Sequence, residues 1–279
     1  MFSKLQRFDS RTFEELLSHY QVERELADRL RTASRQERRS LYGAVYDELY
    51  QRVPLHPQLT RKAFGDQAAK DLSKQLKFLQ RFLSADITFL EVGAGDCALS
   101  FAVAQSVKKV YAIDVSGEIT KGATQPSNFE LILSDGVSID LPANSIQMAY
   151  SNQLMEHLHP DDATEQLINI YRVLVPGGLY VCSTPNRLNG PHDISRHFDR
   201  VASGFHLHEY TMAELSNLFR RVGFSRVAAY LAGIYLEVPL IAVKTWEVLV
   251  DRIPGPLRQI AMRRLPFRLL LVTRLVGTK

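Results

Sequence analysis

The chain has 279 residues, 46% of them hydrophobic and 23% charged, which is the composition of a globular protein with a sizeable core. Two cysteines are too few for a disulfide framework or a cysteine-based zinc site, and they favour a reducing, cytoplasmic location. The first ten residues lack the apolar run of a signal peptide. Glu237, Lys244 and Glu247 interrupt the most apolar region, so no membrane-spanning segment is expected.

The net charge of +4 is unevenly distributed along the chain. Residues 1–80 carry 15 basic and 11 acidic side chains, residues 81–240 carry 11 and 17, and residues 241–279 carry 8 and 2. Nucleic-acid grooves depend on clustered Lys and Arg that face phosphates. The acidic middle therefore argues against nucleic acid at the active site, whereas the basic ends leave a surface for an anionic partner.

Residues 1–83 are predicted to form an N-terminal helical cap. The segments "TFEE" (12–15) and "SRQE" (34–37) have the capping-box spacing of helix starts. Prolines break the helical pattern at 53–57. A third helix follows, and its apolar face is expected to pack against the next domain. That face consists of Leu72, Leu76, Leu79 and Leu83.

Residues 84–231 are predicted to form the core domain, because six short apolar runs alternate there with helical segments. The runs are "ITFLEV", "KVYAIDV", "FELILS", "IQMAYS", "GLYVCST" and "SRVAAYL". Strands that are apolar on both faces indicate a parallel sheet covered by helices, so we expect an α/β, Rossmann-like, mostly parallel seven-stranded sheet. A capping box, "TMAE", starts the helix after Tyr210, and Gly223 ends it.

Residues 232–279 are predicted to hold a helical insertion and the closing strand of the sheet. "VPLIAVKTWEVLVDRI" and "GPLRQIAMRRL" have helical patterns, and "FRLLLVTRLVGTK" is expected to be the strand. The alternative is a peripheral membrane contact, because arginines interleave with apolar residues in this basic segment. These are Arg258, Arg263, Arg264, Arg268 and Arg274. Pro266 would break a long amphipathic helix there.

The segment "LEVGAGDCAL" (90–99) ends a strand in a glycine turn that leads into a helix. Gly93 and Gly95 allow the unusual dihedral angles and the close backbone approach of such a turn, and ligands of open α/β sheets bind at this edge. Asp114 closes the next strand, where its carboxylate could accept hydrogen bonds from both ribose hydroxyls of an adenosine. The turn and Asp114 fit a nicotinamide dinucleotide or S-adenosylmethionine equally well.

Three later features separate these two cofactor classes. The motif "SDG" (134–136) follows the third strand, where a second acid could reach an adenine amino group. The motif "LVPGGLYV" (174–181) joins a helix to the fifth strand through a proline-glycine-glycine turn. None of the eleven tyrosines has a lysine four positions later, so the tyrosine-lysine pair of short-chain dehydrogenases is missing.

Together the motifs resemble those of class I S-adenosylmethionine-dependent methyltransferases, the superfamily that includes quinone-biosynthesis methyltransferases. The resemblance covers residues 85–231 and rests on "EVGAGDC", "AIDVS", "SDG" and "LVPGGLYVCSTPNR" in this order. It implies S-adenosylmethionine as the cofactor. One departure is Cys97, where many members carry a third glycine; we expect a small side chain to be tolerated there.

The resemblance also implies which residues bind the cofactor. Glu91, Gly93 and Gly95 are expected beside its methionine part, where a carboxylate can neutralise the ammonium group. Asp114 is expected at the ribose. Asp135 and Gly136 are expected by the adenine. Ser151 and Asn152 begin the segment "SNQLMEHL", which is expected to run beside the methionine part and toward the acceptor.

The catalytic candidates are histidines. Four of the eight lie in "PHDISRHFDRVASGFHLHEYT", which follows the fifth strand, and a base with a pKa near neutrality would help to deprotonate a hydroxyl acceptor. His206, in "HLHEYT", and His157, in "MEHL", are the two that we select. A structural hydrogen bond between His206 and Glu209 is the alternative for the first.

No metal ion is expected, because methyl transfer from a sulfonium does not require one. A ligand set of His192, Asp193 and His197 was the candidate considered, but its spacing follows no familiar pattern.

The sequence therefore predicts a methyltransferase that moves a methyl group from S-adenosylmethionine to a small-molecule acceptor. The favoured acceptor atom is an oxygen of a lipid-, quinone- or sugar-like compound. The alternatives are a catalytically inactive methyltransferase-like binding protein and an NAD(P)-dependent oxidoreductase. The oligomeric state stays open.

Overall fold

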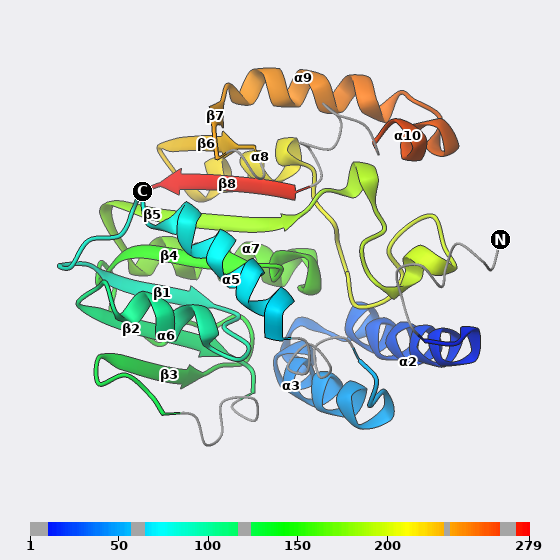
Figure 1. Cartoon of the computed structure of the whole chain (residues 1–279), viewed down its shortest axis with the longest axis horizontal. Coiled ribbons are helices and arrows are strands. Elements are labelled where there is room, and N and C mark those ends of the chain that lie inside the picture. Colours follow the sequence, from blue (N-terminus) through cyan, green and yellow to red (C-terminus); the bar gives the residue numbers. More distant parts are fainter. Residues whose placement is uncertain (1–10, 57–64, 117–123, 232–234, 263–271) are drawn as a thin grey trace.

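The computed structural model describes residues 11–56, 65–116, 124–231, 235–262 and 272–279. Within these residues one sheet of eight strands has the order β3-β2-β1-β4-β5-β8-β6-β7 (Figure 1). The strands are β1 (Thr88–Val92), β2 (Lys109–Asp114), β3 (Phe129–Leu133), β4 (Ile146–Asn152), β5 (Leu174–Pro185), β6 (Arg226–Tyr230), β7 (Glu237–Val238) and β8 (Val272–Thr278).

The direction of the strands confirms the mostly parallel α/β sheet. β1 to β5 pair in parallel, whereas β8 runs antiparallel to both of its neighbours, β5 and β6. The expected number of seven strands was wrong by one, because the two-residue β7 adds an edge strand by pairing with β6. The closing strand is confirmed as β8, which lies between β5 and β6 in the sheet.

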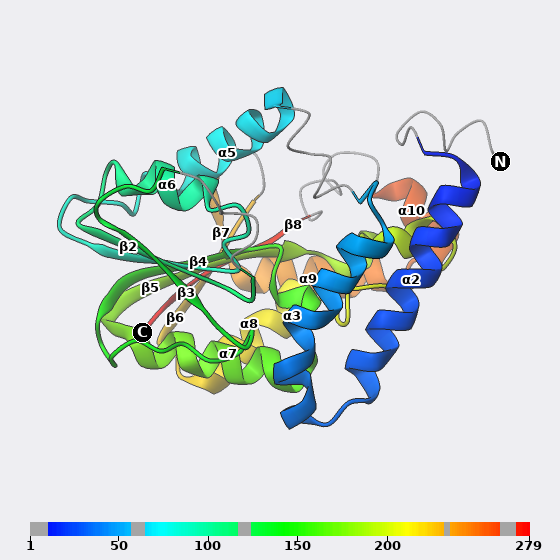
Figure 2. The same ribbon diagram turned by 90° about the horizontal axis from the view of Figure 1, so that it is seen from below.

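Helices cover both faces of the sheet, as Figure 2 shows. One face carries α5 (Gly65–Leu79) and α6 (Ala98–Ala104), and the other carries α7 (Pro160–Val173) and α8 (Met212–Val222). The other helices are α2 (Phe13–Thr32), α3 (Arg35–Arg52), α9 (Leu240–Asp251) and α10 (Gly255–Ala261), and the 3-10 turns are η3 (Met155–His157), η4 (Arg187–Asn189) and η5 (Ile194–His197). The helices α2 and α3 lie beyond the carboxyl ends of the parallel strands (Figure 1).

Local sequence signals determine where several helices begin and end. All three predicted capping boxes form, with the side chain of the first residue accepting from the third helical amide and the glutamate accepting in return. The pairs are Thr12 with Glu15, Ser34 with Glu37 and Thr211 with Glu214. α8 ends at Gly223, whose φ of 120° is a value that favours glycine.

The apolar face of α5 packs on the sheet as predicted. Leu79 is fully buried, and Leu72 and Leu76 contact the same apolar cluster, which contains Phe89 of β1. Leu83 also reaches this cluster, although α5 ends four residues earlier. The packing places α5 above the edge of the sheet where β1 and β2 end.

The C-terminal helices are tied to the core through one buried acid. The Glu247 carboxylate on α9 accepts hydrogen bonds from the Met212 and Ala213 amides at the start of α8, and from the Asn186 side chain. A carboxylate at a helix N-terminus pairs with amides that have no partner inside the helix. No helix among the described residues is long and apolar enough to cross a membrane.

Two of the five arginines of the alternative membrane contact lie among the described residues, and these two do not share one surface. Arg274 lies in β8 with its guanidinium carbon 4.5 Å from the ring centre of Phe78, beneath α5, so its assignment to an exposed anchor was wrong. Arg258 pairs with Asp251 at 2.6 Å. Three of the residues, Arg263, Arg264 and Arg268, lie outside the described residues.

Candidate functional site

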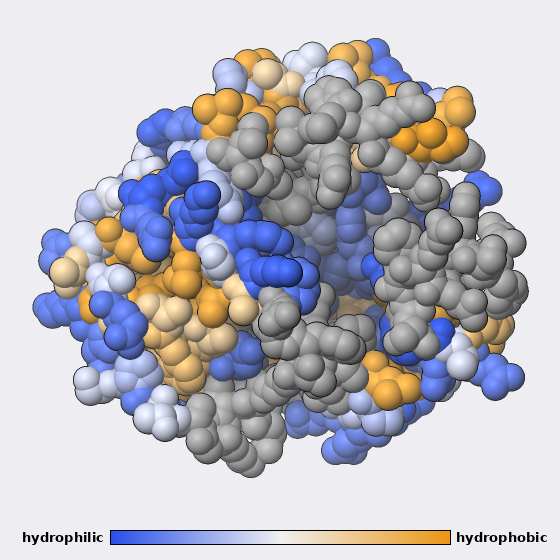
Figure 3. Space-filling view, viewed as in Figure 1, coloured by the Kyte–Doolittle hydropathy of each residue, from blue (hydrophilic) through white to orange (hydrophobic). Residues whose placement is uncertain are grey.

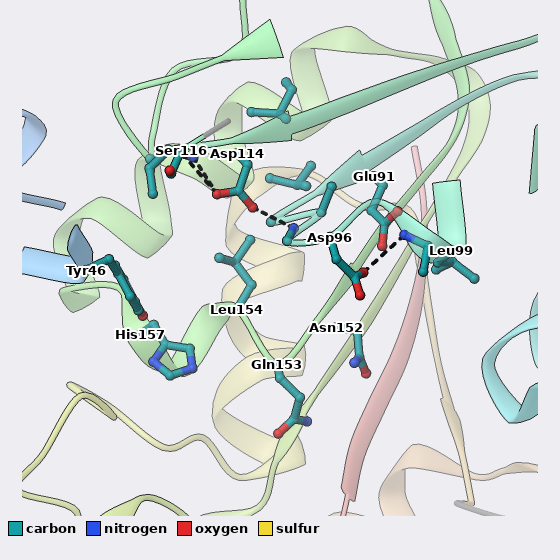
Figure 4. Close-up of a pocket in the computed structure, with 18 of the residues that line it drawn as sticks. Tyr46, Glu91, Asp96, Leu99, Asp114, Ser116, Asn152, Gln153, Leu154 and His157 are labelled. Carbon is teal, nitrogen blue, oxygen red and sulfur yellow. Dashed lines mark hydrogen bonds between the residues drawn. The ribbon is translucent and has the colours of Figure 1, made fainter. Parts of the chain in front are cut away.

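A cavity of about 640 Å³ lies at the carboxyl ends of β1, β2 and β4 and is also lined by residues of α3 and α5. Figure 4 shows part of its wall. These carboxyl ends form the edge at which open α/β sheets bind their ligands, and the volume is within the ordinary range for small-molecule sites. Six of the eight predicted cofactor-binding residues lie on its wall. They are Glu91, Gly93, Gly95, Asp114, Gly136 and Asn152.

The glycine turn between β1 and α6 forms one side of the cavity. Gly93 and Gly95 have φ values of 74° and 55°, in the left-handed region that favours glycine. A Cβ atom at Gly93 would lie 2.9 Å from the Leu154 side chain, whereas one at Gly95 would meet nothing within 4 Å. Cys97 also has a positive φ, of 58°, and its side chain is buried, so a small residue is accommodated where a third glycine was expected.

Asp114 joins the end of β2 to this turn. Its carboxylate accepts hydrogen bonds from the amides of Gly95 at 2.7 Å, Val115 at 2.8 Å and Ser116 at 3.2 Å (Figure 4). Burial raises the pKa of Asp114, and these three amides oppose the rise. The amides hold the acid at the cavity wall, where its free lone pairs can accept from a ligand.

Glu91 is a buried acid on the same wall. The Ser100 hydroxyl donates to its carboxylate at 2.6 Å. Burial raises the pKa of Glu91 to about 8, so the carboxyl keeps its proton at neutral pH until a positive group comes close.

Two predicted residues do not line the cavity. The Asp135 carboxylate accepts from the Val137 and Ser138 amides and pairs with Arg39 of α3 at 3.0 Å. The Ser151 hydroxyl is fully buried and shares a hydrogen bond of 2.6 Å with the Tyr180 hydroxyl. Both groups therefore have hydrogen-bond partners within the protein.

Further cavity residues, beyond the individually predicted ones, come from the N-terminal helices and from the rest of the segment "SNQLMEHL" after β4. Gln153 and Leu154 follow Asn152 along the wall. Helices α3 and α5 cover the cavity with side chains that include Tyr46 and Gln75. One signal was present: the tyrosines of α3 recur at every fourth position and so share one helix face. They are Tyr42, Tyr46 and Tyr50.

Comparisons with known proteins agree with this geometry. Residues 90–182, from β1 into β5, match the family described as "Methyltransferase domain". A probable S-adenosylmethionine-dependent methyltransferase of Mycolicibacterium smegmatis is 29% identical over 137 residues, which are 48% of this chain and 51% of that protein. The chain thus spans about half the length of this relative. These matches support a class I S-adenosylmethionine-dependent methyltransferase domain within this chain.

Solved structures share the fold of this methyltransferase core. A chain of the complex between the Haloferax volcanii Trm112 methyltransferase activator and a methyltransferase has a TM-score of 0.56 at 17% identity, covering 79% of this chain and 95% of its own. The [4+2]-cyclase SpnF has a TM-score of 0.52 at 19% identity, covering 76% and 82%. An S-adenosylmethionine-dependent methyltransferase from Archaeoglobus fulgidus has 0.51 at 14%, covering 75% and 94%.

The cofactor of the superfamily, S-adenosylmethionine, fits the residues that are present. The wall offers Asp114 for ribose hydroxyls and Glu91 for the ammonium group, and the glycine turn leaves open space at Gly95. Figure 4 shows Asp114 and Glu91 on this wall, with Leu154 below Asp114 and Gln153 further down the same view.

The two predicted catalytic histidines lie together beside the methyltransferase cavity, but only His157 lines it. The two rings are 4.8 Å apart, and His206 lies behind His157. The His206 Nδ1–H donates to Glu209 at 2.7 Å, which confirms the structural hydrogen bond. His157 Nδ1–H donates to the carbonyl oxygen of Phe205 at 3.1 Å.

Their environments give the two histidines different charges. Burial lowers the pKa of His157 to about 3, so it is neutral. Burial also opposes the charge of His206, but the hydrogen bond to Glu209 and the nearby Glu156 carboxyl outweigh it and raise its pKa. Burial raises the pKa of Glu156 itself to about 7.

The metal-ligand set considered from the sequence does not come together among the described residues. His192 Nε2 lies 3.1 Å from the carbonyl oxygen of Asn186. The Asp193 carboxylate instead accepts from the amides of Ser195 and Gly204. These hydrogen bonds order the loop that follows β5.

Proposed function

We propose that this chain transfers the methyl group of S-adenosylmethionine to a small-molecule acceptor. The observation that carries the proposal is the continuity of one cavity. It runs from the glycine turn and Asp114 to His157 and the aromatic side chains of α3. A donor and an acceptor can therefore meet in a space that the protein itself lines.

In this proposal the cofactor-binding roles fall on residues of the wall. The Asp114 carboxylate accepts from the ribose hydroxyls, and the glycine turn lets the backbone approach the methionine part. Glu91 faces the ammonium group, whose positive charge favours release of the Glu91 proton. Asn152 and Gly136 line the remaining wall.

The bound cofactor supplies a methyl group that is already electrophilic because it is attached to a sulfonium. The protein then needs to align the acceptor and to exclude water. Tyr46 and His157 form the part of the wall suited to the acceptor; they lie side by side, with ring centres 6.2 Å apart (Figure 4). His206 does not line the cavity and acts through His157, as a positioning residue.

We further propose an acceptor oxygen on a lipid-, quinone- or sugar-like compound, and contact with an anionic lipid surface through α9 and α10. These helices carry an apolar outer face, visible as orange patches over them in Figure 3. Its residues are Ile241, Val248, Leu249, Leu257 and Ile260, each half or more exposed. The described basic residues on or beside these helices are Lys244, Arg252 and Arg258, and positive charge suits anionic lipids.

The proposed activity is tested by cofactor titration together with methyl transfer. We expect calorimetry to show binding of S-adenosylmethionine and S-adenosylhomocysteine but not of NAD⁺ or NADP⁺. Label from the methyl group should appear in acceptor fractions with the wild type and not with Asp114→Ala. Binding of NAD⁺ without S-adenosylmethionine would refute the proposal, and cofactor binding without any transfer would indicate an inactive binding protein.

A further inference from the structure

Three side chains at the inner end of the cavity form a cluster with the spacing of a metal site. One ligand atom each from Glu156, His157 and His206 lies within 4.8 Å of the other two. Glu156 and His157 belong to η3, directly after β4, and His206 lies in the loop before α8. Two chain segments that are far apart in the sequence therefore supply one set of donors.

In each of the three side chains, one polar atom forms a hydrogen bond with another part of the protein. His157 Nδ1–H donates to the Phe205 carbonyl oxygen at 3.1 Å, and His206 Nδ1–H donates to Glu209 at 2.7 Å. The Thr184 hydroxyl donates to one Glu156 oxygen, also at 2.7 Å. Metal-binding histidines characteristically donate their other N–H to a carboxylate or a carbonyl, which fixes the tautomer and the ring orientation. The inward atoms are then two imidazole Nε2 atoms and one carboxylate oxygen.

The second Glu156 oxygen gives independent evidence for an occupant. Oε1 is buried and has no hydrogen-bond partner within the described part of the chain. An unpaired polar atom in the interior costs about 1–3 kcal/mol, more for a charged group. A cation between the three side chains would give this oxygen the partner that it lacks.

We propose that Glu156, His157 and His206 bind a divalent first-row cation, with Zn²⁺ as the reference ion. Two imidazoles and one carboxylate are a donor set that zinc and its neighbours accept, with the cation displacing the proton from His206 Nε2, whereas Mg²⁺ prefers oxygen ligands. Bonds of about 2.1 Å place tetrahedral ligands roughly 3.4 Å apart. The three ligand atoms, which lie within 4.8 Å of one another, would move to about this spacing on binding.

A second histidine cluster shows why the spacing alone is not sufficient. His19, Glu23 and His56 also lie within 4.8 Å of one another. The Arg11 guanidinium, however, lies 2.6 Å from His19 Nδ1, and Glu23 accepts from His19 Nε2 at 2.7 Å and from the Phe205 amide at 3.2 Å. Both Glu23 oxygens therefore accept hydrogen bonds, and the Arg11 charge lies close by. We do not expect this cluster to bind a cation, and it is the control for the proposed site.

The position of the site gives the cation a place in the proposed reaction. His157 is the ligand on the cavity wall, while Glu156 and His206 lie behind it. Three protein ligands leave open coordination positions, as in catalytic zinc sites. In the cavity these positions suit an oxygen of the acceptor. This role rests on the proposed methyl transfer, whereas cation binding does not, and it makes His157 Nε2 a ligand and not a base.

The test uses the full chain after dialysis against EDTA. We expect wild-type protein to bind one equivalent of Zn²⁺ in calorimetry and elemental analysis, and Co²⁺ to give the visible spectrum of a four- or five-coordinate site. Glu156→Gln and His206→Gln should each weaken Zn²⁺ binding at least 10-fold. Two matched variants, His208→Gln in the same loop and His56→Gln in the comparison cluster, should leave it unchanged.

S-adenosylhomocysteine binding, measured on the same samples, reports whether each variant is folded and tests the cofactor site separately. In histidine nitrogen NMR of the wild type, Zn²⁺ should shift two Nε2 resonances; one of them should be missing from the His206→Gln spectrum, and both should remain in the His208→Gln spectrum. Absence of stoichiometric Zn²⁺ and Co²⁺ binding by the wild type would overturn the site, as would binding that Glu156→Gln and His206→Gln leave intact. Metal binding without methyl transfer would support the site and contradict the proposed function.

Discussion

The Asp114 carboxylate accepts a hydrogen bond of 2.7 Å from the amide of Gly95. This contact links the last residue of β2 to the turn that follows β1, two segments that are neighbours only because their strands pair in parallel. The cavity wall is thus assembled by strand pairing, and its shape follows from the register of β1 on β2.

Replacing Asp114 should separate cofactor binding from folding. Asp114→Asn keeps the size of the side chain but removes the charge that accepts from ribose and amides, and hydrogen bonds to charged groups contribute about 1.5–3 kcal/mol. We expect affinity for S-adenosylhomocysteine to fall roughly 10- to 100-fold in calorimetry. The exposed Asp140→Asn is the control, and equal affinities for both variants would contradict the role of Asp114.

The buried acid Glu91 predicts a specific pH dependence. Its pKa is about 8 in the folded protein against an ordinary 4.5, so the folded state holds the proton more tightly than the unfolded state. The free energy of unfolding should therefore decrease as pH rises from about 5 to 8, by up to roughly 1.4 kcal/mol per unit. In urea unfolding, the stability of Glu91→Gln should not show this decrease with pH.

Cofactor binding should displace the proton that Glu91 carries at neutral pH. Below pH 8 the ammonium group favours ionised Glu91, so binding should release a proton, seen as a dependence of the calorimetric heat on the ionisation enthalpy of the buffer. Glu91→Gln should bind more weakly and release no proton. Equal proton release by wild type and Glu91→Gln would exclude Glu91 as its source.

The glycine turn predicts a loss of binding without a large loss of stability. Gly95→Ala places a methyl group in open space at the cavity wall, at a cost of about 1–2 kcal/mol for the left-handed backbone. Gly177→Ala is a matched control, because its φ of 78° is also positive, its Cβ would meet nothing within 4 Å, and it lies outside the cavity. Thermal unfolding should show similar losses for both, while only Gly95→Ala should abolish S-adenosylhomocysteine binding.

The apolar face of α9 and α10 predicts binding to anionic vesicles. Ile241 and Leu257 are 74% and 60% exposed, and replacing both with glutamate removes apolar area and adds repulsion. We expect cosedimentation with phosphatidylserine-containing vesicles to fall at least 10-fold. Ile168→Glu, at an exposed position on α7, should have no effect, and wild-type protein that ignores the vesicles would refute the contact.

Local signals explain what the sequence predicted well. The strands of the core and the three capping boxes depend on residues within a few positions of one another, and each is found where expected. Gly93, Gly95 and Asp114 were predictable for the same reason, since strand ends and turns bring them to one edge.

Long-range pairing explains what the sequence could not give. Asp135 follows β3 as expected, but Arg39, 96 positions earlier, engages its carboxylate. The roof of the cavity depends on how α3 and α5 dock on the sheet, and nothing local to Tyr46 or Gln75 records that docking. The inward grouping of Glu156 and His206 likewise arises only when the loop before α8 folds back onto η3.

The central position of β8 has a consequence for how the chain reaches its native state. β5 and β6 each pair with residues 272–278, so both strands expose unpaired backbone groups until that segment has left the ribosome. Loss of residues 272–278 would therefore leave unpaired edges on both β5 and β6 in the middle of the sheet, and we expect a product that lacks them to aggregate.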